Sequence, residues 1–312
     1  MIPKVSIVMC AYNAGRFIEE AIESVQAQTF ENWELIVVDD GSVDDTAQKV
    51  KAKMEDQRIR YIYQENAKQG KARNNGIAYA RAEWIALIDA DDRWMPEKLQ
   101  LQLSVAKDIQ ADVFYCMVKL MDASGNYMKD EAIESLHTGW LQPKQDMLNG
   151  RNDSFFCSTV LMKKKVFDAV GGFNETPDMA EDYHLYLKLI DCGYTFYRQP
   201  ESLVFYRIHD SQTSSTEFVT FILSVRAYRL VKFKNIPQKQ VTLAIKKRLN
   251  RYLLHNTDTL SAEQRREVLL FYQGFPGLKM HAMMHRCMLL LGMSNYKKWA
   301  YRYVDVKPID CI

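Results

Sequence analysis

Three aspartates fall within the run Asp89-Ala90-Asp91-Asp92, directly after the apolar segment Trp84–Ile88. An apolar segment of this length predicts a buried strand, and Asp89 and Asp91 then project from one face of its end. Their hard carboxylate oxygens suit Mg²⁺ or Mn²⁺, ions that usually keep waters and add phosphate oxygens as ligands. The pair therefore predicts a metal-assisted diphosphate site, where the metal would neutralise charge on a departing phosphate. The alternative is an acidic loop that caps the next helix. For Asp92 itself we expect either this capping role or a place behind the metal ligands.

Polar side chains also follow two other apolar segments. Tyr12 comes after Val5–Met9 and offers a flat face to a nucleobase, a contact favourable by ~1–3 kcal/mol. Asp39 comes after the next segment and can accept the N–H of a uracil-like base. Arg73 lies near the start of a predicted helix, and its guanidinium suits phosphate or ribose oxygens. The alternatives are a rim residue for Tyr12, a turn for Asp39 and a helix-surface ion pair for Arg73.

Strands and helices alternate over the first hundred residues. The predicted strands are Val5–Met9, Leu35–Val38, Ile59–Tyr63 and Trp84–Ile88, and the predicted helices are Arg16–Gln28, Thr46–Met54, Lys71–Arg81 and Pro96–Ile109. This order predicts a parallel sheet with helices on both faces and a ligand beyond the carboxyl ends of the strands. The middle predicts strands Val113–Leu120, Thr195–Tyr197 and Leu203–Ile208 and helices Lys163–Val170 and Glu181–Asp191, and the chain is helical and basic beyond Glu217.

Composition excludes several classes of protein. The 312 residues are 47% hydrophobic and 26% charged, which is typical of a globular protein. A formal net charge of +2 gives no support to a nucleic-acid partner. Six scattered cysteines indicate a reducing compartment. With no signal peptide and no apolar run of ~18 residues, we expect a cytoplasmic protein, with peripheral association at the inner face of a membrane left open.

Several motifs in order resemble the large family 2 of inverting glycosyltransferases, which have the GT-A fold. The resemblance covers about residues 3–215 and rests on Val5-Ser6-Ile7-Val8 with Tyr12-Asn13, Val38-Asp39-Asp40-Gly41-Ser42, Gly70 with Ala72-Arg73-Asn74-Asn75-Gly76-Ile77, Leu87-Ile88-Asp89-Ala90-Asp91-Asp92, Gly171-Gly172-Phe173, Glu181-Asp182 and His209. One departure is Ala82, where the family usually has glycine. The resemblance implies an α/β GT-A domain over 1–216, with a nucleotide-sugar-binding half (1–112), an acceptor-binding half (113–216) and a C-terminal helical region (217–312).

The resemblance also implies roles for individual residues. Asp91 would ligate the metal, Asp89 would hold the donor ribose and contact the metal, and Asp39 would bind the base. His209 would approach the metal or the diphosphate, and a structural histidine is the alternative. Asp182 would be the base that takes the proton of the incoming hydroxyl, beside Glu181 as a residue that binds the acceptor or orients the base. For the last two, charge that complements a helix N-terminus is the alternative.

Together these features predict transfer of a hexose or N-acetylhexosamine from a nucleoside diphosphate sugar, with UDP favoured, to a hydroxyl of a glycan or lipid-linked acceptor. We expect Mn²⁺ or Mg²⁺, a single inverting displacement and a role in surface polysaccharide or lipopolysaccharide assembly. A nucleotidyltransferase is one rival, although Tyr12-Asn13-Ala14-Gly15 is a poor phosphate loop. A non-catalytic sugar-binding module is another. We expect the C-terminal helices to pack on the catalytic domain as a cap or to form a dimer contact. The alternative is a surface that binds at a membrane interface.

Overall fold

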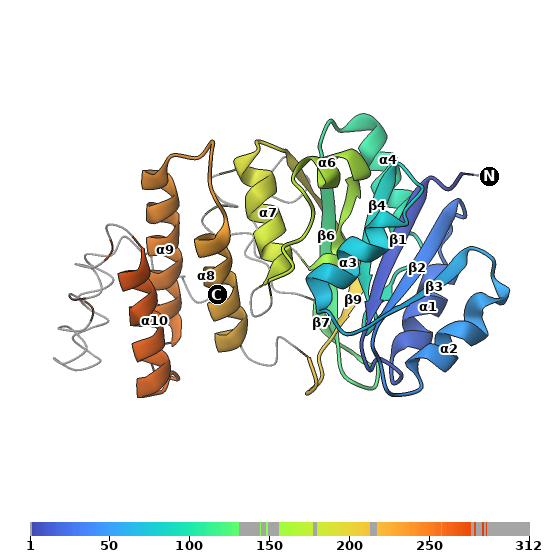
Figure 1. Ribbon diagram of the computed structural model, residues 1–312, viewed down its shortest axis with the longest axis horizontal. Coiled ribbons are helices and arrows are strands. Elements are labelled where there is room, and N and C mark those ends of the chain that lie inside the picture. The colour runs from blue at the N-terminus through green and yellow to red at the C-terminus, as the bar shows by residue number, and fades with distance from the viewer. Residues whose placement is uncertain are drawn as a thin grey trace.

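The computed structural model describes residues 2–130, 156–176, 180–212, 217–256 and 258–275, with the single positions 144, 148, 278, 283 and 285. The described strands, all in one sheet, are β1 (Val5–Ala11), β2 (Trp33–Asp40), β3 (Ile59–Gln64), β4 (Trp84–Asp89), β5 (Arg93–Trp94), β6 (Val113–Met121), β7 (Tyr127–Asp130), β8 (Leu161–Lys163) and β9 (Phe196–Arg207). The described helices are α1 (Ile18–Gln26), α2 (Thr46–Ala52), α3 (Gln69–Ala78), α4 (Lys98–Asp108), α6 (Lys164–Ala169), α7 (Glu181–Asp191), α8 (Glu217–Leu230), α9 (Gln238–Asn256) and α10 (Ala262–Gly274). Figure 1 shows the sheet on one side of the molecule and the last helices on the other.

The sheet has the order β3-β2-β1-β4-β8-β6-β9-β5, and β7 pairs with β6. The first four strands pair in parallel, as the strand–helix alternation predicts, and β8 joins β4 and β6 in antiparallel pairing. The register places Ala11 opposite Asp39 and Cys10 opposite Asp89. The carboxyl end of β1 is therefore flanked by the ends of the two strands that carry predicted site carboxylates.

Helices cover both faces of this sheet because successive side chains of a strand point to opposite sides. In β1, Ile7 belongs to a hydrophobic cluster with residues of α1, α2 and α4. Its neighbour Val8 belongs to a second cluster with residues of α3, α6 and α7. Both side chains are fully buried. The mostly parallel sheet between two helical layers confirms the predicted α/β GT-A class of fold.

The sequence prediction of two short strands, Thr195–Tyr197 and Leu203–Ile208, was wrong. The structure has the single strand β9, which pairs in parallel with β6 through both predicted segments. Pro200 lies between the two predicted segments and has no N–H to give to a neighbouring strand. The register with β6 shifts between Arg198 and Ser202, so Pro200 lies in an irregularity that needs no ladder donor, and the strand continues past it.

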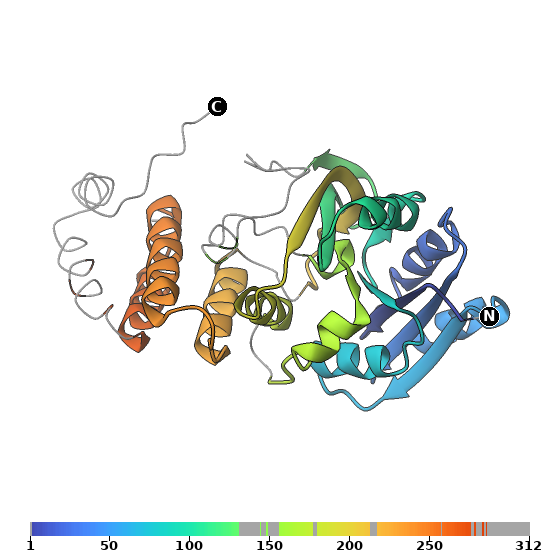
Figure 2. The same ribbon diagram turned by 90° about the horizontal axis from the view of Figure 1, so that it is seen from above.

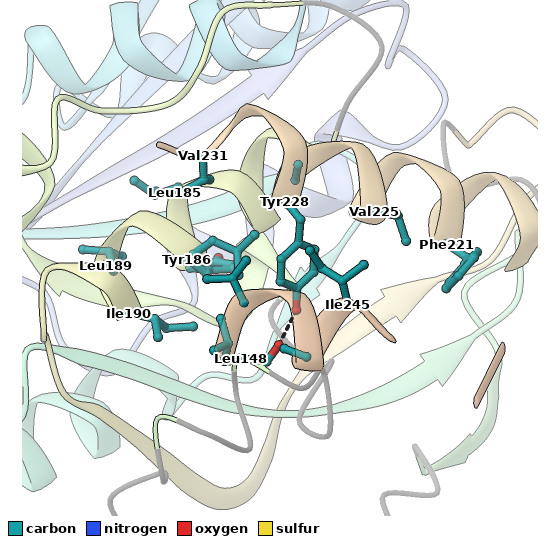
Figure 3. Packing of buried hydrophobic residues seen from close by; sticks show 14 of the residues in the cluster. Leu148, Leu185, Tyr186, Leu189, Ile190, Phe221, Val225, Tyr228, Val231 and Ile245 are labelled. Atoms are coloured by element: carbon teal, nitrogen blue, oxygen red, sulfur yellow. Dashed lines mark hydrogen bonds between the residues drawn. The ribbon is translucent and has the colours of Figure 1, made fainter. Parts of the chain in front are cut away.

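The helices α8, α9 and α10 extend the molecule beyond α7, which lies between the sheet and α8 (Figures 1 and 2). They share one hydrophobic cluster with the sheet, which contains Val8 of β1, Leu185 of α7, Val225 of α8 and Ile245 of α9. Figure 3 shows the part of this cluster between α7, α8 and α9. No described helix is long and apolar enough to cross a membrane. Residues 286–312 lie outside the described part, and the predicted domain limits stay a prediction.

Candidate active site

A cavity of about 590 Å³ lies at the carboxyl ends of β1 and β4 and is lined on its other side by residues of α7, α8 and α9. This volume is in the range of sites that enclose small organic ligands. Its wall includes these predicted site residues: Tyr12, Arg73, Asp89, Asp91, Glu181, Asp182 and His209. Residues from segments more than a hundred positions apart in the chain are thus brought together, and Asp182 shares one cavity with Asp91, as the predicted chemistry requires.

Asp39 is the predicted site residue that does not line this cavity. Its side chain is fully buried, and its carboxylate accepts hydrogen bonds from the Ser42 N–H (2.8 Å) and the Tyr61 hydroxyl (2.7 Å). The neighbouring Asp40 lines the cavity instead, and its carboxylate also accepts two backbone N–H groups from the loop before α3. Base binding by Asp39 stays a prediction.

Tyr12 lies at the rim of the cavity with 56% of its surface exposed. The loop that carries it is fixed to the loop after β2: the Asn13 N–H donates to Ser42 Oγ (2.9 Å), and Asn13 Oδ1 accepts the Val43 N–H (2.9 Å). An exposed ring on an anchored loop leaves its face free to stack against a flat ligand. The position of Tyr12 therefore allows its ring to stack on a base, and this role stays a prediction.

Arg73 is a buried centre of charge in the cavity wall. Its guanidinium donates to Asp89 Oδ1 (2.8 Å) and to the Glu181 carboxylate. Burial raises the pKa of Asp89, and the charge of Arg73 opposes that rise. The alternative of a helix-surface ion pair is wrong, because only 5% of Arg73 is exposed. The helix also begins two residues before the predicted Lys71, at the start of α3, so Arg73 lies in its second turn.

Gly70 and Asn74 hold α3 against the segment before α7. A Cβ at Gly70 would lie 2.3 Å from the Asn174 carbonyl oxygen, so the backbones can approach this closely only with glycine. The side chain of Asn74 pairs with the backbone of Phe173, accepting from its N–H (2.9 Å) and donating to its carbonyl (3.0 Å). These contacts explain the motif physically, because they bring Arg73 within reach of α7.

Asp91 pairs with His209. Asp91 Oδ2 lies 2.9 Å from His209 Nε2, and the other ring nitrogen lies 2.8 Å from Ser211 Oγ. The His209 ring also packs on Phe17, with centroids 4.7 Å apart. A carboxylate beside an imidazole can supply some of the ligands of Mn²⁺ or Mg²⁺. Within the described ranges no group of three His, Cys, Asp or Glu side chains could hold a metal ion. A bound ion would therefore need phosphate or water oxygens as well, which is usual for Mg²⁺.

Asp92 does not cap the following helix, so of the two roles predicted for it the capping role was wrong. The helix α4 begins at Lys98 with Glu97 at its N-cap position and with no side-chain cap. Asp92 is instead buried, where it accepts from the Ser158 hydroxyl and from the Arg207 N–H (3.0 Å). Burial, followed by the charge of Asp91, raises the pKa of Asp92. Asp92 therefore joins the acidic turn to β9 from inside the protein.

Two residues that position this turn were not predicted. Ser158 Oγ accepts the Asp89 N–H (3.0 Å) in addition to its bond to Asp92. Arg207 is buried, and its Nε donates to the Asp91 carbonyl (2.8 Å). Arg207 is the last residue of β9 and precedes His209 by two positions, and this spacing is the signal that could have predicted its role. For Ser158, no pattern in the sequence marks the contact.

Asp182 lies in the first turn of α7. Its Oδ1 accepts the Tyr183 N–H (2.6 Å). Burial in the cavity wall, helped by the neighbouring Glu181 charge and opposed by Arg73, raises the pKa of Asp182 to about 7. A carboxylate with a pKa near neutrality can accept a proton at the pH of a cell. The geometry therefore allows the predicted role of Asp182 as a base.

Known proteins resemble the chain in sequence and in fold. The family model described as glycosyl transferase family 2 matches residues 6–171. A Rickettsia typhi protein described as an uncharacterized glycosyltransferase is 31% identical over 69% of this chain and 67% of its own length. Two other Rickettsia relatives are matched over 35% of their length. The Escherichia coli UDP-Glc:α-D-GlcNAc-diphosphoundecaprenol β-1,3-glucosyltransferase WfgD is 33% identical over 69% of this chain and 81% of its own.

Among solved structures, Staphylococcus aureus TarS 1-349 in complex with UDP-GlcNAc superposes with a TM-score of 0.69. The match covers 96% of this chain and 90% of TarS 1-349 at 18% identity, so it shows a shared fold. The family match spans more than half of the chain and includes the turn at Asp89 and Asp91. The chain therefore belongs to glycosyl transferase family 2.

Proposed function

We propose that this protein transfers a sugar from a nucleoside diphosphate sugar, with UDP favoured, to an acceptor hydroxyl with inversion of the anomeric centre. The observation that carries the proposal is the cavity that Asp182 shares with the Asp91–His209 pair. One part can hold a diphosphate leaving group, and the other has a base with a pKa of about 7. Single-displacement transfer needs both: charge on the leaving group must be stabilised while one base takes a proton.

Each residue has a defined task in this scheme. Asp91 and His209 would hold Mn²⁺ or Mg²⁺, which would stabilise the negative charge of the diphosphate. Arg73 keeps Asp89 and Glu181 in place, where Asp89 meets the donor and Glu181 faces the acceptor side. Asp182 accepts the proton of the attacking hydroxyl as the new glycosidic bond forms.

The relatives support a biological setting. WfgD is named as a glucosyltransferase that uses UDP-Glc and a diphosphoundecaprenol-linked acceptor. A hexosyl or N-acetylhexosaminyl transfer in surface polysaccharide assembly, at the cytoplasmic face of a membrane, is the corresponding proposal for this chain.

A panel of UDP-, GDP- and dTDP-sugars tests the proposal through hydrolysis of the donor by water. We expect release of nucleoside diphosphate from a UDP-sugar in the presence of Mn²⁺ or Mg²⁺ and its loss in EDTA. NMR of the released sugar should show the inverted anomer before mutarotation. No hydrolysis of any donor would contradict the proposal, and equal rates in EDTA would remove the metal from it.

A further inference from the structure

The proposed metal ligands Asp91 and His209 (the metal pair) come from segments 118 positions apart in the chain. Asp91 lies between β4 and β5, and His209 follows the last residue of β9 by two positions. The strands β5 and β9 are antiparallel neighbours, with Arg93 opposite Phe205. The geometry of the metal pair therefore depends on the contacts that join these two segments.

One carboxylate on the helix α1 joins the two segments. Glu20 Oε1 accepts from Arg93 Nη1 (2.7 Å), and its other oxygen, Oε2, accepts from Arg207 Nη2. Arg93 follows Asp91 by two positions, and Arg207 precedes His209 by two positions. Glu20 thus bridges two cations, one beside each member of the metal pair. It does so from outside the set of described residues that line the cavity.

Arg207 connects Glu20 to both members of the metal pair. Its guanidinium is buried, and its Nε donates to the Asp91 carbonyl (2.8 Å). The Arg207 carbonyl accepts from Gln212 Nε2, and Gln212 Oε1 accepts the His209 N–H (3.2 Å). A buried charge is costly unless it is paired. The ion pair with Glu20 therefore favours the position from which Arg207 bonds to both segments.

The start of α1 also contacts the imidazole of the metal pair. Phe17 is at the N-cap position of α1, three residues before Glu20. Its ring packs on the His209 ring, with centroids 4.7 Å apart, and the Arg207 guanidinium lies 4.8 Å from the Phe17 centroid. Glu20 and Phe17 therefore hold Arg207 from one helix end, and the same end supports His209.

We propose that Glu20 is a positioning residue for the metal pair. By bridging Arg93 and Arg207 it holds Asp91 and His209 in their observed arrangement, and so sets the affinity of this pair for Mn²⁺ or Mg²⁺. The inference rests on the proposed function, since it concerns the same metal pair. Groups that hold metal ligands in place typically change metal affinity by about 10- to 100-fold when they are removed.

Titration of the full chain with Mn²⁺ at saturating UDP, with EPR of the free ion as the signal, tests the effect on the metal. Glu20→Ala should weaken Mn²⁺ binding by about tenfold or more. Glu19→Ala is the matched control, because it removes a carboxylate from the same helix turn, and its partner Lys49 keeps an ion pair with Asp45 (3.2 Å). This control should leave the Mn²⁺ affinity unchanged. Equal weakening by both variants would show that negative charge alone acts, and would overturn the proposal.

Arg93→Gln separates positioning from charge by the sign of its effect. Loss of a positive charge near the site should by itself strengthen the binding of a cation. Loss of one arm of the bridge should weaken it, because Glu20 then no longer joins the two segments. We expect weaker Mn²⁺ binding in this variant. Unchanged or tighter binding would contradict the bridge.

Hydrogen exchange of the metal-free protein reports on the same contacts without the metal. In Glu20→Ala, the amides of residues 89–92 and 207–212 should exchange faster than in the wild type, while those of β2 and α3 keep their rates. Glu19→Ala should match the wild type throughout. Unchanged rates in the two segments would overturn the proposal. Faster exchange everywhere, with a lower melting temperature, would do the same, because it would indicate a general loss of stability.

The two readouts also separate this proposal from the proposed function. If the wild type binds no Mn²⁺ in the presence of UDP, the metal part of the proposed function is wrong. The exchange rates of the metal-free variants would still decide whether Glu20 holds Asp91 and His209 in place.

Discussion

The strand ends on one side of the cavity and the helices on the other position their side chains by different means. Asp89 and Asp91 follow β4, whose pairing with β1 is fixed residue by residue. Asp182 and Arg248 come from α7 and α9, which are brought together by the hydrophobic cluster between α7, α8 and α9 (Figure 3). Backbone hydrogen bonds position the strand-end wall, which carries Asp89 and Asp91. Side-chain packing positions the helical wall, which carries Asp182 and Arg248.

This difference predicts where each wall is sensitive. A change at the strand ends leaves the sheet in place, so its effect should stay local to donor and metal. A change on the helical wall can act on the chemistry and on the packing together, because burial also tunes the pKa of Asp182. Variants that separate chemistry from stability are therefore the sharpest tests of the comparison.

The largest effect is expected for Asp182→Asn. Loss of a general base typically costs about 10²- to 10⁴-fold in rate, so transfer should fall by that amount while the Kd for the donor stays close to that of the wild type. The amide can still accept the Tyr183 N–H, so α7 should keep its first turn. Steady-state transfer and donor binding by calorimetry measure the two quantities. An active Asn variant would displace Asp182 as the base.

The same variant should be more stable than the wild type at pH 8. The folded protein raises the pKa of Asp182 from 3.8 to about 7, so it binds the proton more tightly than the unfolded chain does. The free energy of unfolding should therefore fall as pH rises from about 4 to 7 in the wild type, and this part of the fall should be absent in Asp182→Asn. Melting temperatures at pH 5 and pH 8 measure the difference. Parallel pH profiles for the two proteins would contradict the raised pKa.

The strand-end wall could be predicted from sequence because its residues stand at fixed offsets from apolar runs. Asp89 and Asp91 follow β4 directly, and α7 begins at Glu181 as predicted. The helical wall could not be predicted in this way. Arg248 meets Tyr183 across 65 positions through packing that leaves no local pattern. Ser158 reaches Asp92 across 66 positions for the same reason.

On the strand-end wall, Asp91→Asn should abolish metal-dependent donor binding. We expect a loss of about 100-fold or more in metal affinity, because changing a residue that only hydrogen-bonds to a metal ligand already costs about 10- to 100-fold. The reason is the loss of the charged oxygen that faces His209. Metal titration in the presence of UDP, followed by calorimetry, measures the effect. In contrast to Asp182→Asn, thermal stability at pH 8 should change little. Unchanged turnover in Asp91→Asn would remove the metal role from this residue.

The pH dependence of transfer should show the raised pKa of Asp182 on the helical wall. Asp182 must lose its proton to act as a base, so kcat/KM should rise about tenfold per pH unit below its pKa of about 7 and level off above it. Rates in overlapping buffers from pH 5 to 9, at a metal concentration that saturates at each pH, measure the profile. A rate that is flat through pH 6 or that falls with rising pH would exclude Asp182 as the titrating base.

The smallest effect is expected for Ser158→Ala, which tests how much the buried hydrogen bonds of Ser158 stabilise the strand-end wall. The hydroxyl donates to the buried Asp92 and accepts the Asp89 N–H, so its loss leaves both groups with one partner fewer. An unsatisfied buried group costs about 1–3 kcal/mol, and the free energy of unfolding should fall by that amount in urea titrations. Ser104→Ala on α4 is the matched control, because among the described residues its hydroxyl bonds within its own helix turn, to the Leu101 carbonyl. If Ser158→Ala and Ser104→Ala cost the same, the bonds behind the acidic turn would not be what holds Asp89 and Asp91 at the strand end.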